Sequence, residues 1–253
     1  MTTTTVPDLM SSMLDKDPAR PFVTFYDGAT GERTELSVKS FENWVAKTAN
    51  LLQNELDAGP DTHVALWLPT HWLSAVWMCA GAACGSVVSG YPDTARITKA
   101  DVIVCGPETL DTAAAATAAR VVALSLDPMV RGFVGQLPDG VLDYGPEVLS
   151  QDDVFVPSRP PDSETPLVHD GEFAHPQGEL LGEARHQAGR LGIQQAGRLL
   201  THLNPASLVG FVIGVLAPMV SDGSVVLVRN GYEAMIDELA RQERVGTRLW
   251  QPG

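Results

Sequence analysis

The sequence predicts an α/β protein with layered, doubly wound, mostly parallel sheets joined by crossover helices. From Phe22 onward, short apolar runs typical of strands alternate with longer runs whose apolar residues recur every three or four positions, as in amphipathic helices. The 253 residues are 44% apolar, which suffices for a sizeable core. Regular alternation of this kind favours parallel sheets, with any ligand site at the carboxyl ends of the strands.

The first half of the chain opens with a predicted hairpin and continues with alternating helices and strands. The hairpin strands are residues 22–26 and 33–36, and the glycines of the intervening DGATG suit a turn at positive φ. Ser37 is the expected cap of the first helix. The remaining predicted elements are helix 37–56, strand 63–68, helix 72–84, strand 86–89, strand 101–105, helix 110–119 and strand 120–124.

A proline-rich segment is the best candidate for a domain boundary. Residues 157–166 contain Pro157, Pro160, Pro161 and Pro166, which exclude a helix or a central strand. We therefore predict an N-terminal α/β subdomain at 1–156, a linker at 157–166 and a C-terminal α/β subdomain at 167–253. The second subdomain is expected to hold strand 167–170, helix 176–191, strand 198–203, helix 206–220, strand 224–228, helix 232–244 and strand 247–250.

Charge and composition exclude several classes of function. Seventeen basic and thirty-one acidic residues give a net charge of −14, which repels nucleic acid and anionic lipid. The uncharged stretches 72–91 and 208–220 are too interrupted by glycine or too short for a membrane span. Residues 1–15 lack the basic and apolar regions of a secretory signal, so a cytoplasmic location is expected.

Two blocks of the chain resemble the adenylate-forming superfamily, the AMP-dependent acyl-CoA synthetases and ligases. Residues 22–92 include TELS at the entry of a helix and AGAACGSVV at 80–88, similar to the opening of these enzymes. Residues 205–252 include GFVIGVLAPM at 210–219 and GSVVL at 223–227, similar to the helix and strand around the acyl-pocket motif. The resemblance implies the fold of the N-terminal half, as in short stand-alone actinobacterial proteins related to these ligases.

The segment that corresponds to the family's phosphate loop has lost its chemistry. These enzymes hold ATP phosphates with a TSGTTG-type loop followed by PKG, whereas this chain reads VHDGEFAHPQG at 168–178. Carboxylates at Asp170 and Glu172 would repel phosphate by about 1 kcal/mol each in water at roughly 4 Å. Gln177 stands in place of the lysine. The resemblance makes this a degenerate nucleotide site, formed by His169, Asp170, Gly171, His175, Gln177 and Gly178.

The acyl-pocket motif is also altered. Ala206 and Ser207 stand at the family's aromatic and histidine positions and, with Asn204, are the substrate-pocket candidates that the resemblance suggests. The strand GTRLWQP at 246–252 resembles the one before the family's tyrosine-glycine-threonine-glutamate motif. Trp250 on this strand covers a sheet edge or binds a partner chain, and a homo-oligomer through that edge is one expectation.

Other catalytic and metal sites are weaker alternatives. His169 and His175 bracket a predicted strand end, but His169, His175, His186 and His202 lack the helical i, i+4 spacing of zinc hydrolases and fit surface or hydrogen-bonded histidines. Cys79, Cys84 and Cys105 lie in apolar runs without zinc or disulfide spacing. The sequence contains no Gly-x-Ser-x-Gly, dinucleotide or Walker motif.

The sequence therefore favours a ligase-like pseudoenzyme that binds an unknown small molecule or protein. No catalytic residue, metal or nucleic-acid partner is predicted, and AMP or ATP is the only cofactor that the resemblance suggests. The alternative is a nucleotide- or acyl-binding ligase component that a partner completes.

Overall fold

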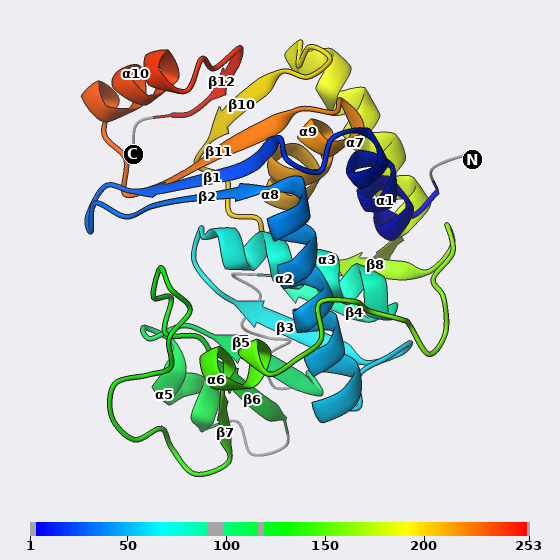
Figure 1. Cartoon of the computed structure of the whole chain (residues 1–253). Helices are drawn as coiled ribbons and strands as arrows, with labels where there is room; N and C mark the ends of the chain where they lie inside the picture. The colour runs from blue at the N-terminus through cyan, green and yellow to red at the C-terminus, as the bar shows by residue number, and fades with distance from the viewer. Residues whose placement is uncertain (1–3, 91–98, 116–118, 252–253) are drawn as a thin grey trace.

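The computed structural model describes residues 4–90, 99–115 and 119–251, which form two β-sheets with helices packed between and around them (Figure 1). The ends of the two blocks that carry the family resemblance, at Tyr91, Pro92 and Pro252, lie outside the described residues, as do residues 116–118 of the predicted helix 110–119.

The larger sheet has seven strands in the order β7-β6-β5-β3-β4-β8-β9. All neighbours are parallel except the β8–β9 hairpin. The strands are β3 (His63–Trp67), β4 (Val87–Gly90), β5 (Val102–Cys105), β6 (Arg120–Ala123), β7 (Val141–Asp143), β8 (Pro166–His169) and β9 (Ala174–Pro176).

The smaller sheet has five strands in the order β12-β10-β11-β1-β2, and only the β1–β2 hairpin is antiparallel. Its strands are β1 (Pro21–Asp27), β2 (Arg33–Ser37), β10 (Arg198–Thr201), β11 (Ser224–Arg229) and β12 (Thr247–Leu249). The doubly wound, mostly parallel α/β architecture expected from the sequence is confirmed.

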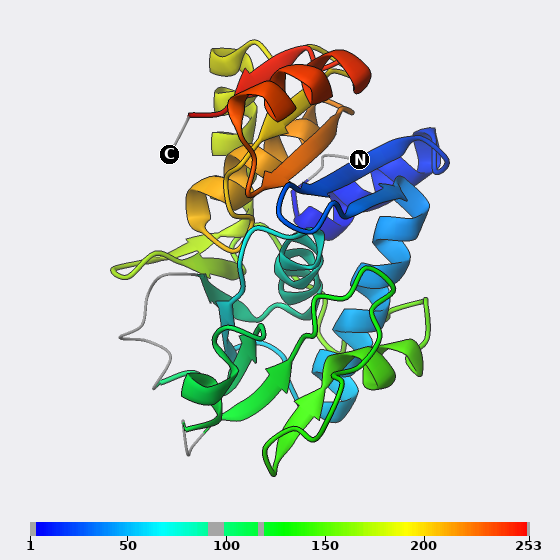
Figure 2. The same ribbon diagram turned by 90° about the vertical axis from the view of Figure 1, so that its left-hand side faces the viewer.

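Both sheets combine strands from the two halves of the chain. Strand β8 follows the proline-rich segment and pairs with β4 of the first half, while β1 of the first half pairs with β11 of the second. Figure 2 shows the blue hairpin beside the orange strand β11, with the red strand β12 at the far edge of the same sheet. The segment 157–166 therefore does not separate the two sheets, although it is loop up to Pro166, where β8 begins.

The helices fill the space between the sheets and cover their outer faces. They are α1 (Val6–Lys16), α2 (Val38–Asn50) continued by the π-turn η1 (Leu51–Glu55), α3 (Trp72–Cys84), α5 (Leu110–Ala114), α6 (Tyr144–Leu149), α7 (Gln177–Leu191), α8 (Leu208–Phe211) with η2 (Val212–Leu216) and α9 (Ala217–Val220), and α10 (Glu233–Gln242). Helix α3 contacts β1 of one sheet and β3 of the other, which explains why every one of its residues is buried.

Glycine makes this close packing possible. A Cβ atom at Gly81 of α3 would lie 2.5 Å from Val88 Cγ2, and one at Gly210 would lie 1.8 Å from the carbonyl oxygen of Asn204. The glycines that recur four residues apart on α3 and on α8–η2 thus include positions that serve packing, as the sequence suggested.

Four elements, α1, β7, α6 and β9, were not predicted. Helix α1 begins with a capping box in which Thr5 and Asp8 exchange hydrogen bonds, α6 follows the very short β7, and β9 occupies part of the segment expected to be a loop. Within the described residues, no helix has the length and apolarity needed to cross a bilayer.

Candidate functional site

The segment 168–178, which the sequence resemblance matches to a phosphate loop, contains the turn of the β8–β9 hairpin. Its strands pair Val168 with His175 and His169 with Ala174, and the tip is the turn at Asp170–Phe173. Gly171 has a φ of +114°, a conformation open to glycine but strained for other residues. The tip of the hairpin is therefore a short, tight turn.

Asp170 closes this turn from within. Its Oδ1 accepts hydrogen bonds from the amides of Glu172 and Phe173, both at 2.9 Å, and its own amide donates to the carbonyl of Phe173 at 3.1 Å. The amide of Gly171 donates to His169 Nδ1 at 3.1 Å. The bond from the Phe173 amide, together with those from His175 and Glu172, lowers the pKa of the Asp170 carboxyl well below its usual range. The amides that could hold an anion therefore already hold a carboxylate.

His175 engages one ring nitrogen on the hairpin and the other on the first turn of α7. Nε2 lies 2.8 Å from Asp170 Oδ2 and Nδ1 lies 2.9 Å from Glu179 Oε1. The hydrogen bonds to Asp170 and then to Glu179 raise the pKa of His175. Asp170, His175 and Glu179 therefore form a hydrogen-bonded group in which both ring nitrogens of the histidine have partners.

Gln177, which the sequence resemblance sets at a lysine position of the ligases, points into the interior. It is fully buried; its Oε1 accepts from the amide of Val6 at 2.9 Å and its Nε2 donates to the carbonyl of Ala82 at 2.9 Å. The next residue, Gly178, donates its amide to the carbonyl of Ser163 at 2.9 Å. Gln177 thus joins the start of α1 to the end of α3.

The three substrate-pocket candidates form a packed joint between the sheets. Asn204 Nδ2 donates to the carbonyl of Leu68 at 2.8 Å, and its Oδ1 accepts from the amide of Ala206 at 3.0 Å. Ser207 Oγ accepts from the amide of Gly210 at 3.0 Å and caps α8. Ala206 is buried, and a Cβ at Gly90 would lie 1.3 Å from its carbonyl oxygen.

The hairpin and the joint at 204–207 do not line the same groove. His175 shares an apolar groove with Leu208 and Val209 at the start of α8, whereas Asn204, Ala206 and Ser207 do not line it. Trp250 lies just after β12 at the edge of the five-stranded sheet, with the Arg248 guanidinium 5.5 Å from its ring centroid. The edge position of this strand agrees with the sequence prediction, and oligomer formation through it stays a prediction.

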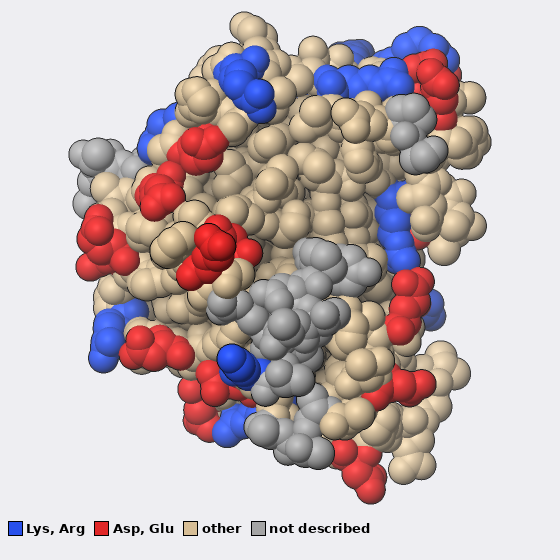
Figure 3. Space-filling model, turned by 180° about the vertical axis from the view of Figure 1, so that it is seen from behind, with Lys and Arg blue, Asp and Glu red and all other residues tan. Residues whose placement is uncertain are grey.

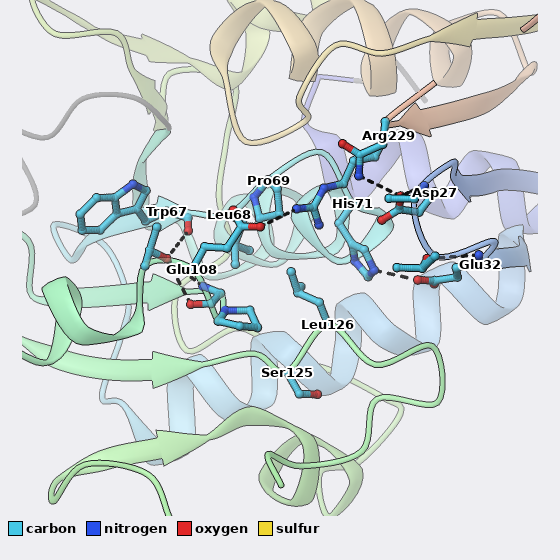
Figure 4. Close-up of a pocket in the computed structure, with 16 residues that line it drawn as sticks. Asp27, Glu32, Trp67, Leu68, Pro69, His71, Glu108, Ser125, Leu126 and Arg229 are labelled. Atoms are coloured by element: carbon cyan, nitrogen blue, oxygen red, sulfur yellow. Dashed lines mark hydrogen bonds and ion pairs between the residues drawn. The ribbon is translucent and has the colours of Figure 1, made fainter. Parts of the chain in front are cut away.

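A cavity of about 470 Å³ lies where the carboxyl ends of strands from both sheets meet. It is lined from the ends of β1, β3, β5, β6 and β11, the place at which parallel α/β sheets bind ligands (Figure 4). Its polar lining includes Asp27, Glu32, His71, Glu108 and Arg229. We call it the inter-sheet pocket.

His71 is the most unusual residue of the inter-sheet pocket. It is 1% exposed and caps α3, because its Nδ1 accepts the amide of Leu73 at 3.1 Å. Nε2 is buried without a hydrogen-bond partner, 3.8 Å from Glu32 Oε1. Burial, with a smaller contribution from Arg229, lowers the pKa of His71 to about 3, so the ring is neutral.

Carboxylates dominate the charge around His71. Asp27 is buried and its Oδ1 accepts from the amide of Ala29 at 2.8 Å and from Asn230 Nδ2 at 2.9 Å. Burial raises the pKa of Glu32, which accepts the Thr34 hydroxyl at 2.8 Å. Arg229 lies 3.2 Å from Glu108, whose side chain is largely exposed.

Comparison with known proteins places the chain in a family. No protein-family model matches the chain. A protein of Mycobacterium tuberculosis (strain ATCC 25618 / H37Rv), the TIGR03089 family protein, is 36% identical over 247 residues, which cover 94% of this chain and 94% of the relative. The chain belongs to the TIGR03089 family.

A solved structure reveals the family's fold. The crystal structure of Brucella canis acyl-CoA synthetase matches with a TM-score of 0.77 at 14% identity, over 95% of this chain and 46% of the synthetase. The resemblance to the N-terminal half of adenylate-forming enzymes is thereby confirmed as a resemblance of fold. This TIGR03089 family member spans under half the length of that synthetase.

The sequence did not single out the residues of the inter-sheet pocket. They come from five separate strand ends, and only the rule that ligands bind at such ends pointed to them.

The cysteines are buried free thiols, and burial raises the pKa of Cys84 and of Cys105 to about 12. In the part of the chain that the structure describes, no three His, Cys, Asp or Glu side chains form a metal-binding group. On the face in Figure 3, basic side chains lie singly or in small groups among acidic ones.

Proposed function

We propose that this protein is a ligase-like binding protein that does not form adenylates. Its role is to bind a small molecule in the cleft between its sheets, on a scaffold shared with acyl-CoA synthetases. One observation carries the proposal: the amides of Glu172 and Phe173, in the segment that corresponds to the phosphate loop, both donate to the carboxylate of Asp170. Adenylyl transfer depends on positioning and charge stabilisation of phosphate, which this turn does not offer.

The position of Gln177 supports the same proposal. In the adenylate-forming ligases that the sequence resembles, a lysine contributes a cation beside the phosphates. Gln177, in contrast, is buried and hydrogen-bonded to backbone groups of Val6 and Ala82. Moving it toward a nucleotide would leave these two buried groups unpaired, at a cost of about 1–3 kcal/mol each.

Nucleotide titration tests this function. A ligand at 100 times its Kd stabilises a protein by about 2.7 kcal/mol, so tight binding of ATP with Mg²⁺ or of AMP raises the Tm. We expect no shift with either nucleotide, and no exchange of pyrophosphate into ATP in the presence of carboxylic acids. An active acyl-CoA synthetase under the same conditions is the positive control.

Two outcomes would contradict the proposal. Saturable stabilisation by ATP would support a nucleotide-binding component that a partner completes. Steady release of pyrophosphate by the purified chain would make it a working enzyme.

A further inference from the structure

The inter-sheet pocket contains a hydrogen-bond donor that the protein itself does not satisfy. Buried polar atoms in proteins nearly always have a partner. His71 Nε2 has none, although the residue is 1% exposed and lines the pocket. A buried atom of this kind needs a specific explanation, and a ligand or an ordered water that enters the pocket is the simplest one.

The contacts of the ring fix which nitrogen carries the proton. Nδ1 accepts the Leu73 amide in the cap of α3, so in the neutral ring the hydrogen is on Nε2. Burial keeps the ring neutral by lowering its pKa to about 3. The pocket therefore presents an uncharged N–H donor, which requires an acceptor.

Glu32 supplies the second half of the recognition site. Its Oε1 lies 3.8 Å from His71 Nε2, too far for a hydrogen bond between them. A ligand oxygen that enters between them from the pocket, which both residues line, would bond to both at about 2.8 Å, within the usual hydrogen-bond range. That oxygen must accept from His71 and donate to Glu32, which describes a hydroxyl group. Figure 4 shows the two side chains facing each other.

The remaining lining selects against negative charge. Asp27, Glu32 and Glu108 contribute carboxyl groups, while the guanidinium of Arg229 is already paired with Glu108. An anionic ligand would therefore meet more negative than positive charge. Leu68, Pro69 and Leu126 add apolar surface suited to a carbon skeleton, and about 470 Å³ lies within the usual range for small-molecule sites.

We propose that the inter-sheet pocket binds a neutral, polyhydroxylated small molecule of the sugar or polyol class, with one hydroxyl between His71 Nε2 and the Glu32 carboxyl. This deepens the proposed function and rests on its claim that the chain acts by binding. The ligand carries no phosphate or carboxylate at this point of contact.

Saturation-transfer NMR on the full chain is the first test, with D-glucose, D-ribose and myo-inositol as probes and gluconate as the charged counterpart of glucose. We expect transfer to at least one neutral probe and none to gluconate. Asn is a good helix cap, so His71→Asn keeps an acceptor for Leu73 while removing Nε2. This variant and Glu32→Ala should each weaken binding of the neutral probe about tenfold.

Matched controls separate loss of contact from loss of fold. Glu55→Ala removes an exposed carboxylate from η1, outside the pocket, and should leave probe binding unchanged. ¹⁵N NMR should also detect a neutral Nε2–H tautomer of His71 whose Nε2 signal shifts when the probe is added, a change that a purely structural histidine would not give.

Two results would overturn the inference. One is transfer to no neutral probe, or to a probe whose binding both variants leave intact. The other is a crystal soaked with the probes in which a water molecule alone bridges His71 and Glu32. Neither result concerns nucleotides, so this inference can fail while the absence of ATP binding stands, and the reverse also holds.

Discussion

Two histidines that lie beside carboxylates in this protein differ in their hydrogen bonding. On the β8–β9 hairpin, His175 uses both ring nitrogens on Asp170 and Glu179 and is partly exposed. In the inter-sheet pocket, His71 uses Nδ1 on the α3 cap and leaves Nε2 without a partner, although it is almost completely buried. The hairpin turn is thus closed by its own groups, whereas the pocket contains a histidine nitrogen without a partner.

The largest expected effect concerns the residue that anchors the hairpin. Gln177→Lys introduces the lysine that the resemblance to the ligases suggests. It places an ammonium in a fully buried site, with the Ala82 carbonyl as its partner, and leaves the Val6 amide unpaired. We expect the free energy of unfolding to fall by about 3 kcal/mol or more, as measured by urea denaturation.

The matched control lies on the same helix. Gln187 is only partly buried and its side chain hydrogen-bonds to the surface residues Glu183 and Arg190, so Gln187→Lys should change stability by no more than about 0.5 kcal/mol. Equal stability of the two variants would mean that Gln177 can leave its buried position, and the closed state of the hairpin would no longer follow.

A second prediction tests whether closed packing extends from the hairpin to the joint at 204–207. Gly90 ends the strand beside β8, and a Cβ there would lie 1.3 Å from the Ala206 carbonyl oxygen. Gly90→Ala should therefore cost about 2–3 kcal/mol, because the backbone must shift. Thermal and urea unfolding give the value.

Gly182→Ala is the opposite control. No atom lies within 4 Å of a Cβ at Gly182, in the interior of α7, so alanine should stabilise the protein by about 0.5–1 kcal/mol. A tolerated Gly90→Ala would indicate an open joint, with room for a substrate beside Ala206.

The architecture was more readable from the sequence than the site. Helix α3 matches its predicted range because His71 and Gly85 mark its ends and every residue between them suits a buried helix. Helix α1 was missed although Thr5, Pro7 and Asp8 carry helix-start signals. The π-turns η1 and η2 continue helices without a distinct sequence pattern, so their residues were predicted simply as helix.

The candidate site was only partly predictable for a physical reason. The sequence resemblance suggests that Asp170 and Gln177 replace phosphate-binding groups, but it does not predict that Asp170 closes a turn and that Gln177 is buried. The pocket depends on Glu32, His71 and Arg229, which are far apart in the chain and meet only when both sheets form. The order of residues along the chain does not show that these three side chains come together in the fold.

The third prediction uses the low pKa of His71, about 3. Below about pH 6.5 the unfolded chain protonates this histidine while the folded protein does not, so stability falls as the pH falls from about 6.5 toward 3. This contribution should make the protein about 2 kcal/mol less stable at pH 5 than at pH 7.

His71→Asn isolates this contribution, because asparagine does not titrate. The difference in unfolding free energy between the variant and the natural protein should change with pH by the same amount. Parallel pH profiles would show that His71 titrates normally and would contradict its burial as a neutral donor.

The smallest predicted effect belongs to the hairpin. The pKa of His175 is raised and that of Asp170 is lowered. The Asp170–His175 pair therefore stabilises the fold fully at pH values above the ordinary pKa of an aspartate and below the ordinary pKa of a histidine. The stabilisation fades as the pH rises through the pKa of His175 or falls through that of Asp170. In ¹H NMR titration, Asp170→Asn should lower the pKa of His175, and an unchanged value would contradict the contact.

The turn at 170–173 holds its own carboxylate, that of Asp170, on the amides of Glu172 and Phe173, and the proposed function depends on this contact. Titration of the ¹⁵N-labelled protein with ATP and Mg²⁺, followed through the amides of Gly171, Glu172 and Phe173, tests it most directly. We expect these three signals to stay at their positions throughout the titration. Saturable shifts of all three, with perturbation of Gln177, would show that phosphate displaces Asp170 and that the turn is open to nucleotide.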